Sequence, residues 1–458
     1  MIRCITFFLL SALLAISGCT VGPDYQGPPE IDIDSWYLEN PETDRSLRQP
    51  IDPLWWKNFN DPILDELLIL IAQENYSLRI AVAQIERVRG ALRVAQAGFF
   101  PALSGEASYQ RSRRSENSEF GQFPGIDMNN ETWQAGFDAS WELDLFGRTR
   151  RQVESGEAML DAAVYGRHDA LISIQAEAAR IYMEFRAAQA LTNIAVKQAQ
   201  LQEETAELIE KQVKEGQASE YQLARIQALA TRTRSQIPQS RAQAKAAVYG
   251  LALLAGKPPE AMAYLLETEA PLPLVKDPVR VGLPSEMLRR RPDIRQAERM
   301  LAARNADIGA AIANLFPSVS LTGRIGFESQ SFGNLIDTAS RTWLVNPFIQ
   351  IPLFNRGELR AQIAIAEADE RIALLQYEQA VYSALQEAQE SLTYYAENLD
   401  SLVLQQKSLT HTVKMEKLAN IRYRAGEDDL LNLSDAQEQL LQSEQQVVKT
   451  RLAALTAL

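Results

Sequence analysis

One cysteine near the start of the chain stands where a covalent modification could occur. The first residues, MIRCITFFLLSALLAISGC, give one basic residue, an apolar run, and then Ser17 and Gly18 before Cys19. This order is typical of an export signal that is too short to span a membrane as a mature helix. Ile16 to Cys19 is similar to a bacterial lipobox, in which cleavage leaves the cysteine as an acylated N-terminus. We therefore predict a signal peptide over residues 1–18 and lipid on Cys19.

The acyl chains on Cys19 would anchor the mature chain stably to a membrane. Thr20 follows where an inner-membrane retention signal would carry aspartate, which favours the bacterial outer membrane. Cys4 leaves with the signal peptide, so the mature chain has one cysteine and no internal disulfide. The alternative is an ordinary signal peptide with a chance cysteine, which leaves Cys19 without a role.

No other residues predict a reaction. His168 and His411 are the only histidines, and neither has metal-ligand spacing or a nucleophile motif around it. We therefore predict no enzyme, no metal and no cofactor apart from the lipid. The formal net charge of -13 argues against nucleic acid as a partner, because a binder needs a basic face. We interpret the short basic run from Arg289 to Arg291 as a solvated helix end.

Three sequence blocks recur in the same order, which indicates an internal duplication. Residues 95–109 align with 311–325, residues 143–148 with 351–356, and residues 213–223 with 423–433. The shifts of 216, 208 and 210 residues are all even, so strand faces are preserved between the copies. The predicted parts are an arm over 19–61, repeat 1 over 62–257, a proline-rich linker over 258–282 and repeat 2 over 283–458.

Each repeat has the pattern helix, strand, strand, long helix, glycine turn and helix. The long helices expected over 148–214 and 357–424 would each reach about 100 Å at 1.5 Å per residue. Leu385, Ala388 and Leu392 belong to a series with alternating three- and four-residue steps, which predicts coiled-coil packing of these helices. The other helices are expected over 62–99, 219–255, 285–313 and 429–455.

The glycine turns carry local signals of their own. Gly216 and Gly426 suit the left-handed position after a helix end. Ser219 with Gln222 predicts a capping box for the helix that follows, and Asp428 or Asp429 is expected to cap its counterpart in repeat 2. The result is two helical hairpins.

The stretch WQAGFDASWELDLF alternates strictly between apolar and polar residues. Trp133, Phe137 and Trp141 share one face of the predicted strand, and Asp138 and Glu142 lie on the other. Similar alternation predicts four strands in all, at about 101–112, 131–146, 317–328 and 343–354. A sheet packed on a soluble core is the alternative, but the export signal and the long helices argue against it.

Four strands are too few to close a barrel in a membrane. Every strand edge in a bilayer must be paired, so only a closed barrel is stable there, and closure takes at least about 8 strands. Two copies of the chain would pool about 8 strands and three copies about 12, and only the larger ring leaves a wide aqueous lumen. We therefore predict an oligomer that shares one barrel, with the long helices continuing the tube across the periplasm.

These residues resemble the TolC-like outer-membrane efflux family, in its lipoprotein branch of OprM and NodT type. The resemblance covers essentially the whole mature chain. It is carried by CTVGPDY from Cys19, RRRPDIRQAE from Arg289, the Phe-Pro pairs at 100–101 and 316–317, IPLFNRG from Ile351, and RYRAGEDDLLNLSDAQ from Arg422. It implies a mainly α-helical homotrimer with a 12-stranded β-barrel and a helical periplasmic barrel. It also implies a passive exit duct that conducts drugs or other toxic small molecules from an inner-membrane pump of RND type through a periplasmic adaptor.

The resemblance further implies a gate at the periplasmic end. By position, Tyr423 matches the family's tyrosine, and Asp435 matches an aspartate of its acidic constriction. Asn432 and Asp428 stand where some members have aspartate and arginine, so the salt bridges of those members do not transfer. Gln222 is the polar counterpart in the first hairpin. A ring of three Asp435 carboxylates would favour cations, whereas plain alternatives are a solvated helix residue for Asp435 and simple packing for Tyr423.

The hairpin tips are expected to bind the adaptor, with Gly216, Ser219 and Gly426 at the contact, and binding would favour an open helix arrangement. A coiled-coil lipoprotein that tethers the envelope is a rival, but it does not explain four alternating strands. A type I protein-secretion duct is the nearest alternative within the channel class.

Overall fold

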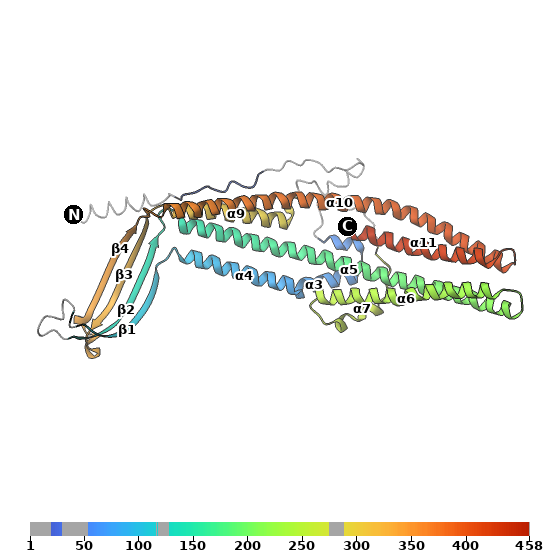
Figure 1. Ribbon diagram of the computed structural model, residues 1–458, viewed down its shortest axis with the longest axis horizontal. Helices are drawn as coiled ribbons and strands as arrows, with labels where there is room; N and C mark the ends of the chain where they lie inside the picture. Colours follow the sequence, from blue (N-terminus) through green and yellow to red (C-terminus); the bar gives the residue numbers. More distant parts are fainter. Residues whose placement is uncertain (1–19, 30–53, 116, 118–127, 274–287, 458) are drawn as a thin grey trace. The chain divides into compact units, whose positions relative to one another are not determined.

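The computed structural model describes residues 20–29, 54–115, 117, 128–273 and 288–457 (Figure 1). The predicted signal peptide and Cys19 lie outside the described residues, as do most of the arm, part of the first strand tip and part of the linker. The chain forms two compact units, each built from three segments. Unit 1 comprises Met1–Glu30, Ala83–Tyr165 and Arg295–Gln379, and unit 2 comprises Ile31–Val82, Gly166–Ile294 and Ala380–Leu458.

The order of elements occurs twice along the chain, as the duplication predicts. Repeat 1 contains α3 (Pro62–Glu74), α4 (Tyr76–Ala97), β1 (Ala102–Arg113), β2 (Asn129–Leu143), α5 (Arg148–Lys214) and α6 (Glu220–Leu254). Repeat 2 contains α9 (Pro292–Ala313), β3 (Ser318–Ser329), β4 (Arg341–Gln350), α10 (Arg356–Arg424) and α11 (Leu430–Thr456). Short helical pieces are η1 (Trp55–Phe59), η2 (Pro259–Met262), α7 (Tyr264–Glu267), η3 (Phe332–Asn334) and η4 (Thr338–Ser340). The fold is thus mainly helical with one small sheet, as expected.

The single helix predicted over 62–99 is wrong at one point, because Asn75 interrupts it. Asn75 has an extended backbone, with ψ of 128°. Its side-chain oxygen accepts hydrogen bonds from the backbone N–H groups of Ser77 (2.9 Å) and Leu78 (3.2 Å), and its amide nitrogen donates to the carbonyl of Leu254. Asn75 therefore ends α3, caps α4 and ties both to the end of α6, a combination that apolar periodicity does not report.

The main core of unit 2 lies where α3, α5 and α6 meet. Its fully buried side chains include Leu64, Leu68, Ile71, Tyr182, Phe185 and Leu251. Asp61 fixes the start of α3, since its carboxylate accepts hydrogen bonds from the backbone N–H groups of Ile63 (3.0 Å) and Leu64 (3.3 Å), and Pro62 follows at the first helical position.

A buried polar chain crosses this core. The Tyr182 hydroxyl donates to Oδ2 of Asp61 (2.6 Å) and accepts from Nε of Arg186 (2.9 Å). Arg186 is fully buried and also donates to the carbonyl of Thr268 at 2.7 Å. Burial, followed by the hydrogen bond to Asp61, raises the pKa of Tyr182, so the phenol stays a neutral donor. The chain of contacts joins α3, α5 and the inter-repeat linker.

We expect Tyr182→Phe to lower the free energy of unfolding by about 1–3 kcal/mol, because it leaves both Asp61 and Arg186 without a shared partner. Thermal unfolding followed by far-ultraviolet circular dichroism measures the effect as a lower Tm. Tyr249→Phe, at an exposed position of α6, is the matched control. Equal Tm values for the two variants would contradict the expectation.

The basic run before α9 differs from its interpretation as a solvated helix end. Arg291 is 28% exposed, and its Nη2 lies 2.8 Å from Oδ2 of Asp293 and 2.7 Å from Oε2 of Glu387. Both carboxylates share one guanidinium, so the side chain ties the beginning of α9 to α10. The interpretation was wrong for Arg291 because the partner on α10 is almost a hundred residues away in sequence.

The four strands form one antiparallel sheet in the order β1-β2-β3-β4 (Figure 1). β2 pairs with β3, so the sheet joins the two repeats. β2 and β4 end at Leu143 and Gln350, several residues before the predicted ends. Pro352 follows β4 and Pro347 lies within it; proline cannot donate to a ladder and is tolerated on strands at the end of a sheet.

Among the described residues, no core covers either face of this sheet. Leu103 is 71% exposed, Ile325 is 65% exposed and Trp343 is 76% exposed on one face, and most residues of β1 and β4 are exposed on both faces. Within the described chain, β1 and β4 each pair with one strand. The soluble-core alternative is therefore not supported.

Candidate functional site

Charged and amide side chains link β2 to β3 on one face of the sheet. The register places Asp138 opposite Arg324 and Gln134 opposite Glu328. Nε of Arg324 lies 3.8 Å from Oδ1 of Asp138, its Nη2 donates to Oε1 of Gln134 at 3.2 Å, and the amide nitrogen of Gln134 donates to Glu328 at 3.1 Å. These four residues form a polar ladder on the face that the sequence predicted to be wet.

The opposite face carries large aromatic side chains. The ring of Trp133 lies 4.2 Å from the ring of Tyr109 and 5.0 Å from that of Phe332. Phe137 is 57% exposed. The indole nitrogen of Trp141 donates to the carbonyl of Phe99 at 3.1 Å, so this side chain is anchored where α4 leads into the sheet. The apolar and polar residues of the WQAGFDASWELDLF stretch therefore lie on opposite faces, as expected.

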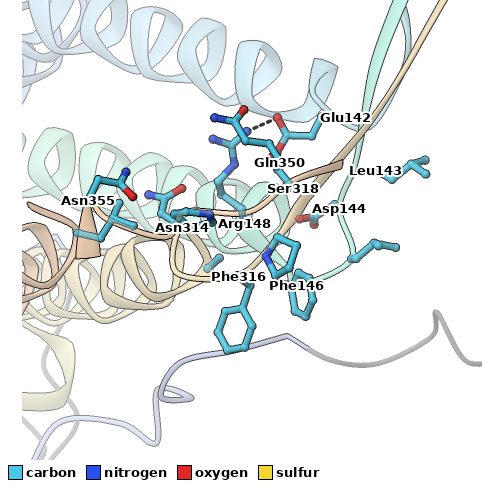
Figure 2. A pocket seen from close by; sticks show the side chains of 15 residues that line it. Glu142, Leu143, Asp144, Phe146, Arg148, Asn314, Phe316, Ser318, Gln350 and Asn355 are labelled. Atoms are coloured by element: carbon cyan, nitrogen blue, oxygen red, sulfur yellow. Dashed lines mark hydrogen bonds and ion pairs between the residues drawn. The ribbon is translucent and has the colours of Figure 1, made fainter. Parts of the chain in front are cut away.

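A polar cavity of about 320 Å³ lies where the strands give way to the helices (Figure 2). Its polar lining is Glu142, Asp144, Arg148, Asn314, Ser318, Gln350 and Asn355. Nη2 of Arg148 lies 2.6 Å from Oε2 of Glu142, the contact drawn in Figure 2. The cavity has contributions from both repeats, so a polar surface continues beyond the ends of the strands within unit 1.

The turn between β2 and α5 is built by its own residues. The Asp144 carboxylate accepts hydrogen bonds from the backbone N–H groups of Thr149 and Arg150, each at 3.0 Å, and so caps α5. Gly147 has φ of 83°, which a residue with a Cβ adopts only with strain. Beside it the rings of Phe146 and Phe316 stack with centroids 4.7 Å apart. The step from the strand predicted at about 131–146 to the helix predicted over 148–214 is thus a capped helix start.

The two hairpin tips in unit 2 have the predicted local chemistry. Gly216 and Gly426 have φ of 73° and 76°, in the left-handed region. Ser219 and Gln222 form the expected capping box at the start of α6. Of the two candidates for α11, Asp429 is the cap, since its carboxylate accepts from the backbone N–H of Asn432 at 3.0 Å.

Tyr423 joins the two hairpins. Its hydroxyl donates to Oε1 of Gln212 on α5 at 3.0 Å, and its ring packs against a small cluster whose buried members are Ile209, Ile226, Leu430 and Leu433. Burial raises the pKa of Tyr423, so the phenol remains a neutral donor at physiological pH. The tyrosine therefore both packs at the hairpin end and makes a hydrogen bond between repeats.

The Asp435 carboxylate forms an ion pair with an arginine of the same chain. Its Oδ1 lies 2.8 Å from Nη2 of Arg225 on α6, with the two side chains 52% and 34% exposed. Farther along the same two helices, Nη1 of Arg232 lies 3.3 Å from Oε1 of Glu438. An arginine of the same chain thus lies beside the Asp435 carboxylate, and the expectation that a ring of three Asp435 carboxylates favours cations stays a prediction.

The residue pattern and the sheet agree with a comparison to known proteins. The model of a family described as "Outer membrane efflux protein" matches residues 67–257 and 283–458. The chain belongs to the outer membrane efflux protein family.

Named relatives and solved structures resemble this efflux protein over almost its whole length. It is 31% identical to the antibiotic efflux pump outer membrane protein ArpC of Pseudomonas putida, over 96% of this chain and 91% of that protein. It is 29% identical to the cation efflux system protein CusC of Escherichia coli, over 96% and 94% of the two chains. The structure of the outer-membrane channel OprN matches with a TM-score of 0.88 and 34% identity, covering 96% of this chain and 97% of that one.

The other predicted tip residues have contacts within their own hairpin. Asp428 accepts hydrogen bonds from the Asn432 side chain and from the backbone N–H of Asp429, and its Oδ2 lies 3.5 Å from Nε of Arg422. These bonds, the one from Asn432 first, lower the pKa of Asp428. The side-chain oxygen of Gln222 accepts from Ser219, so Gln222 closes its own cap. Gate roles for these residues in the efflux protein stay predictions.

Two residues of this region were missed from the sequence, Gln212 and Arg225. Arg225 lies one repeat shift of 210 residues before Asp435, so the duplication marks it as the equivalent position of repeat 1. Other contacts between α6 and α11 do not keep this shift, since Gln236 contacts Gln445, 209 residues away. The duplication therefore singles out Arg225 but does not predict its contact with Asp435.

Among the described residues of the efflux protein, no helix combines the length and the apolar character that a bilayer span requires. No cluster of three or more histidine, cysteine or acidic side chains with metal-binding potential occurs within the same described ranges. Cys19, the predicted lipidation site, lies outside those ranges.

Proposed function

We propose that this protein is the exit duct of a tripartite efflux system and that it works as a homotrimer. The observation that carries the proposal is the sheet, whose two faces are exposed and whose β1 and β4 each pair with one strand of the described chain. A bilayer offers no water to satisfy free N–H and C=O groups. Pairing β1 of one copy with β4 of the next satisfies both edges, and three copies close a 12-stranded barrel.

Conduction through this barrel is passive. The polar ladder of Asp138, Arg324, Gln134 and Glu328 faces the aqueous lumen, and the face with Trp133 and Phe137 meets lipid. This assignment follows the alternation of polar-in and apolar-out residues that a membrane barrel requires. The polar cavity at Glu142 and Arg148 then continues the wet surface beyond the strand ends.

A periplasmic adaptor docks at the hairpin tips around Gly216, Ser219 and Gly426, and an inner-membrane pump of RND type supplies the energy. Binding favours an open arrangement of the hairpins only if the adaptor binds that arrangement more tightly than the closed one. The contacts that resist opening are those between repeats, the Tyr423–Gln212 hydrogen bond and the Arg225–Asp435 ion pair. The duct performs no catalysis of its own.

The cargo consists of drugs or other toxic small molecules. Relatives of similar identity are named for antibiotics in one case and for cations in another. Two relatives that each align with almost the whole of this chain are thus named for cargoes of different chemistry, which supports selection of the cargo by the pump. Acyl chains on Cys19 hold the duct in the outer membrane.

Migration on a denaturing gel tests the shared barrel. We expect the protein from an outer-membrane fraction to migrate as a trimer without heating and as a 51.2 kDa chain, less its signal peptide, after boiling. The same sample is expected to give single channels in a planar bilayer. A monomer that salt extracts from the membrane would contradict the proposal and favour an envelope tether instead.

A further inference from the structure

The residues after the predicted acylation site lie against the turn between β2 and α5. Residues 20–25, called the strap here, belong to unit 1 with that turn. The backbone N–H of Val21 donates to the carbonyl of Phe146 at 3.2 Å. Nη1 of Arg150 donates to the hydroxyl of Thr20, also at 3.2 Å. The first described residues of the chain are therefore bound at the end of the sheet.

Arg151 forms the centre of this contact. Its side chain is 3% exposed. Nε donates to the carbonyl of Val21 at 3.2 Å, and Nη2 donates to the carbonyl of Gly22 at 3.4 Å and to Oδ1 of Asp24 at 2.7 Å. Nη1 donates to Glu154 of its own helix at 2.8 Å. Three of its four acceptors belong to the strap, and a buried guanidinium that lost them would be left poorly compensated.

Glycines allow the strap to approach two helices closely. Gly22 has φ of 96°, and a Cβ added to it would lie 2.4 Å from Cα of Gly309 on α9. A Cβ added to Gly309 would lie 2.8 Å from Nε of Arg151. The strap backbone at Gly22, Gly309 of α9 and the Arg151 guanidinium therefore pack so closely that no methyl group fits between them. Such close packing indicates a specific contact of the strap with α5 and α9.

The far end of the strap is partly buried at Tyr25. Tyr25 packs against the buried cluster of Ala158, Ala302 and Ala303, and the guanidinium of Arg299 lies 5.8 Å from its ring centre. Burial and the nearby Glu298 raise the pKa of Tyr25 to about 12. α5 belongs to repeat 1 and α9 to repeat 2, so the strap contacts both repeats within unit 1.

We infer that the strap is a docking element, that Arg151 is its receptor, and that together they fix the mature N-terminus at the turn between β2 and α5. The inference rests on the proposed acylation of Cys19. Thr20, which follows Cys19 in the sequence, is held at the junction of sheet and helices, so the docked strap leaves no long free segment after the acylated residue. The anchor sets the depth of the sheet in the bilayer, which a long free tether would not do.

Hydrogen exchange of the intact trimer tests the docking from the strap side. Gly22→Ala is expected to speed amide exchange of residues 20–25 about tenfold or more, because the added methyl group blocks the approach to Gly309. Gly27→Ala is the matched control. Gly27 also has a left-handed backbone, with φ of 101°, but a Cβ there would meet no atom within 4 Å. Equal exchange of residues 20–25 in both variants and in wild type would overturn the inference.

Arg151→Gln tests the docking from the receptor side. Like Gly22→Ala, this substitution is expected to speed amide exchange of residues 20–25. Arg180→Gln should leave the exchange rates of these amides unchanged. Arg180 lies on the same helix and also pairs with two carboxylates, Glu177 and Glu184, but it is 43% exposed and belongs to unit 2. If Arg151→Gln forms no trimer, the exchange rates of residues 20–25 in Gly22→Ala alone test the docking. Unchanged exchange in a folded Arg151→Gln trimer would remove Arg151 as the receptor.

The mass of the N-terminal peptide separates this inference from the function on which it rests. Acylated Cys19 with fast-exchanging strap amides in wild type would overturn the docking and leave the exit duct intact. A peptide without lipid would overturn the anchoring by Cys19, whatever the exchange rates show.

Discussion

Gly136→Val is expected to abolish the heat-resistant trimer and the channel activity of this protein. Gly136 lies opposite Gly326 in the register of β2 and β3. A Cβ at Gly136 would lie 2.6 Å from the carbonyl oxygen of Ile325 and 2.9 Å from Cα of Gly326. These are backbone atoms of the neighbouring strand, so they cannot give way without breaking the ladder that joins the two repeats. Overpacking at a single site destabilises a protein by about 1–3 kcal/mol. In the trimer the same destabilisation would occur in each of the copies.

Gly105→Val provides the control for this prediction. Gly105 is a strand glycine of the same sheet, but a Cβ there would contact only the Phe137 side chain, at 3.7 Å or more. Valine favours strands, so we expect this variant to keep the trimer band on an unheated gel. A Gly136→Val trimer as heat-resistant as that of Gly105→Val would show that the close approach of β2 and β3 is not required.

Local patterns of the sequence identify most of the fold. The period of two in Trp133 to Leu143 predicts a strand and its two faces, because side chains of a strand alternate whatever surrounds them. Gly216 and Ser219 predict a turn and a cap, because left-handed backbone and an N-cap are properties of a few adjacent residues. The duplication then transfers each element from one repeat to the other, and the structure has the same order in both.

Contacts between distant segments could not be predicted in this way. Asn75 breaks a helix whose apolar pattern continues through it, and its partner at Leu254 is 179 residues away. Arg291 contacts Glu387 on another helix. The charges along the sequence alone predict instead that a basic run of this kind is exposed to solvent. Asp435 illustrates the same limit within the candidate gate, because the family resemblance supplied its position but not the arginine opposite it.

Charge reversal at Arg225 is expected to open the periplasmic end. Arg225→Asp places two carboxylates across α6 and α11 where an ion pair stood at 2.8 Å. An exposed pair contributes under about 1 kcal/mol to stability, so we expect a folded trimer. The repulsion instead biases each hairpin away from the closed arrangement. Single-channel conductance in planar bilayers should rise by a factor of about two or more.

A double variant with the two charges exchanged decides whether loss of the ion pair or the changed charge alone causes the higher conductance. Arg225→Asp with Asp435→Arg restores an ion pair of opposite direction and should return the conductance to the wild-type value. Arg234→Asp is the control, since Arg234 pairs at 2.8 Å with Glu203 inside the hairpin of repeat 1 and does not join the repeats. If the double variant conducts as Arg225→Asp does, the pair is not a latch. If it conducts as wild type does while Arg234→Asp has no effect, opening requires α6 and α11 to separate at this contact.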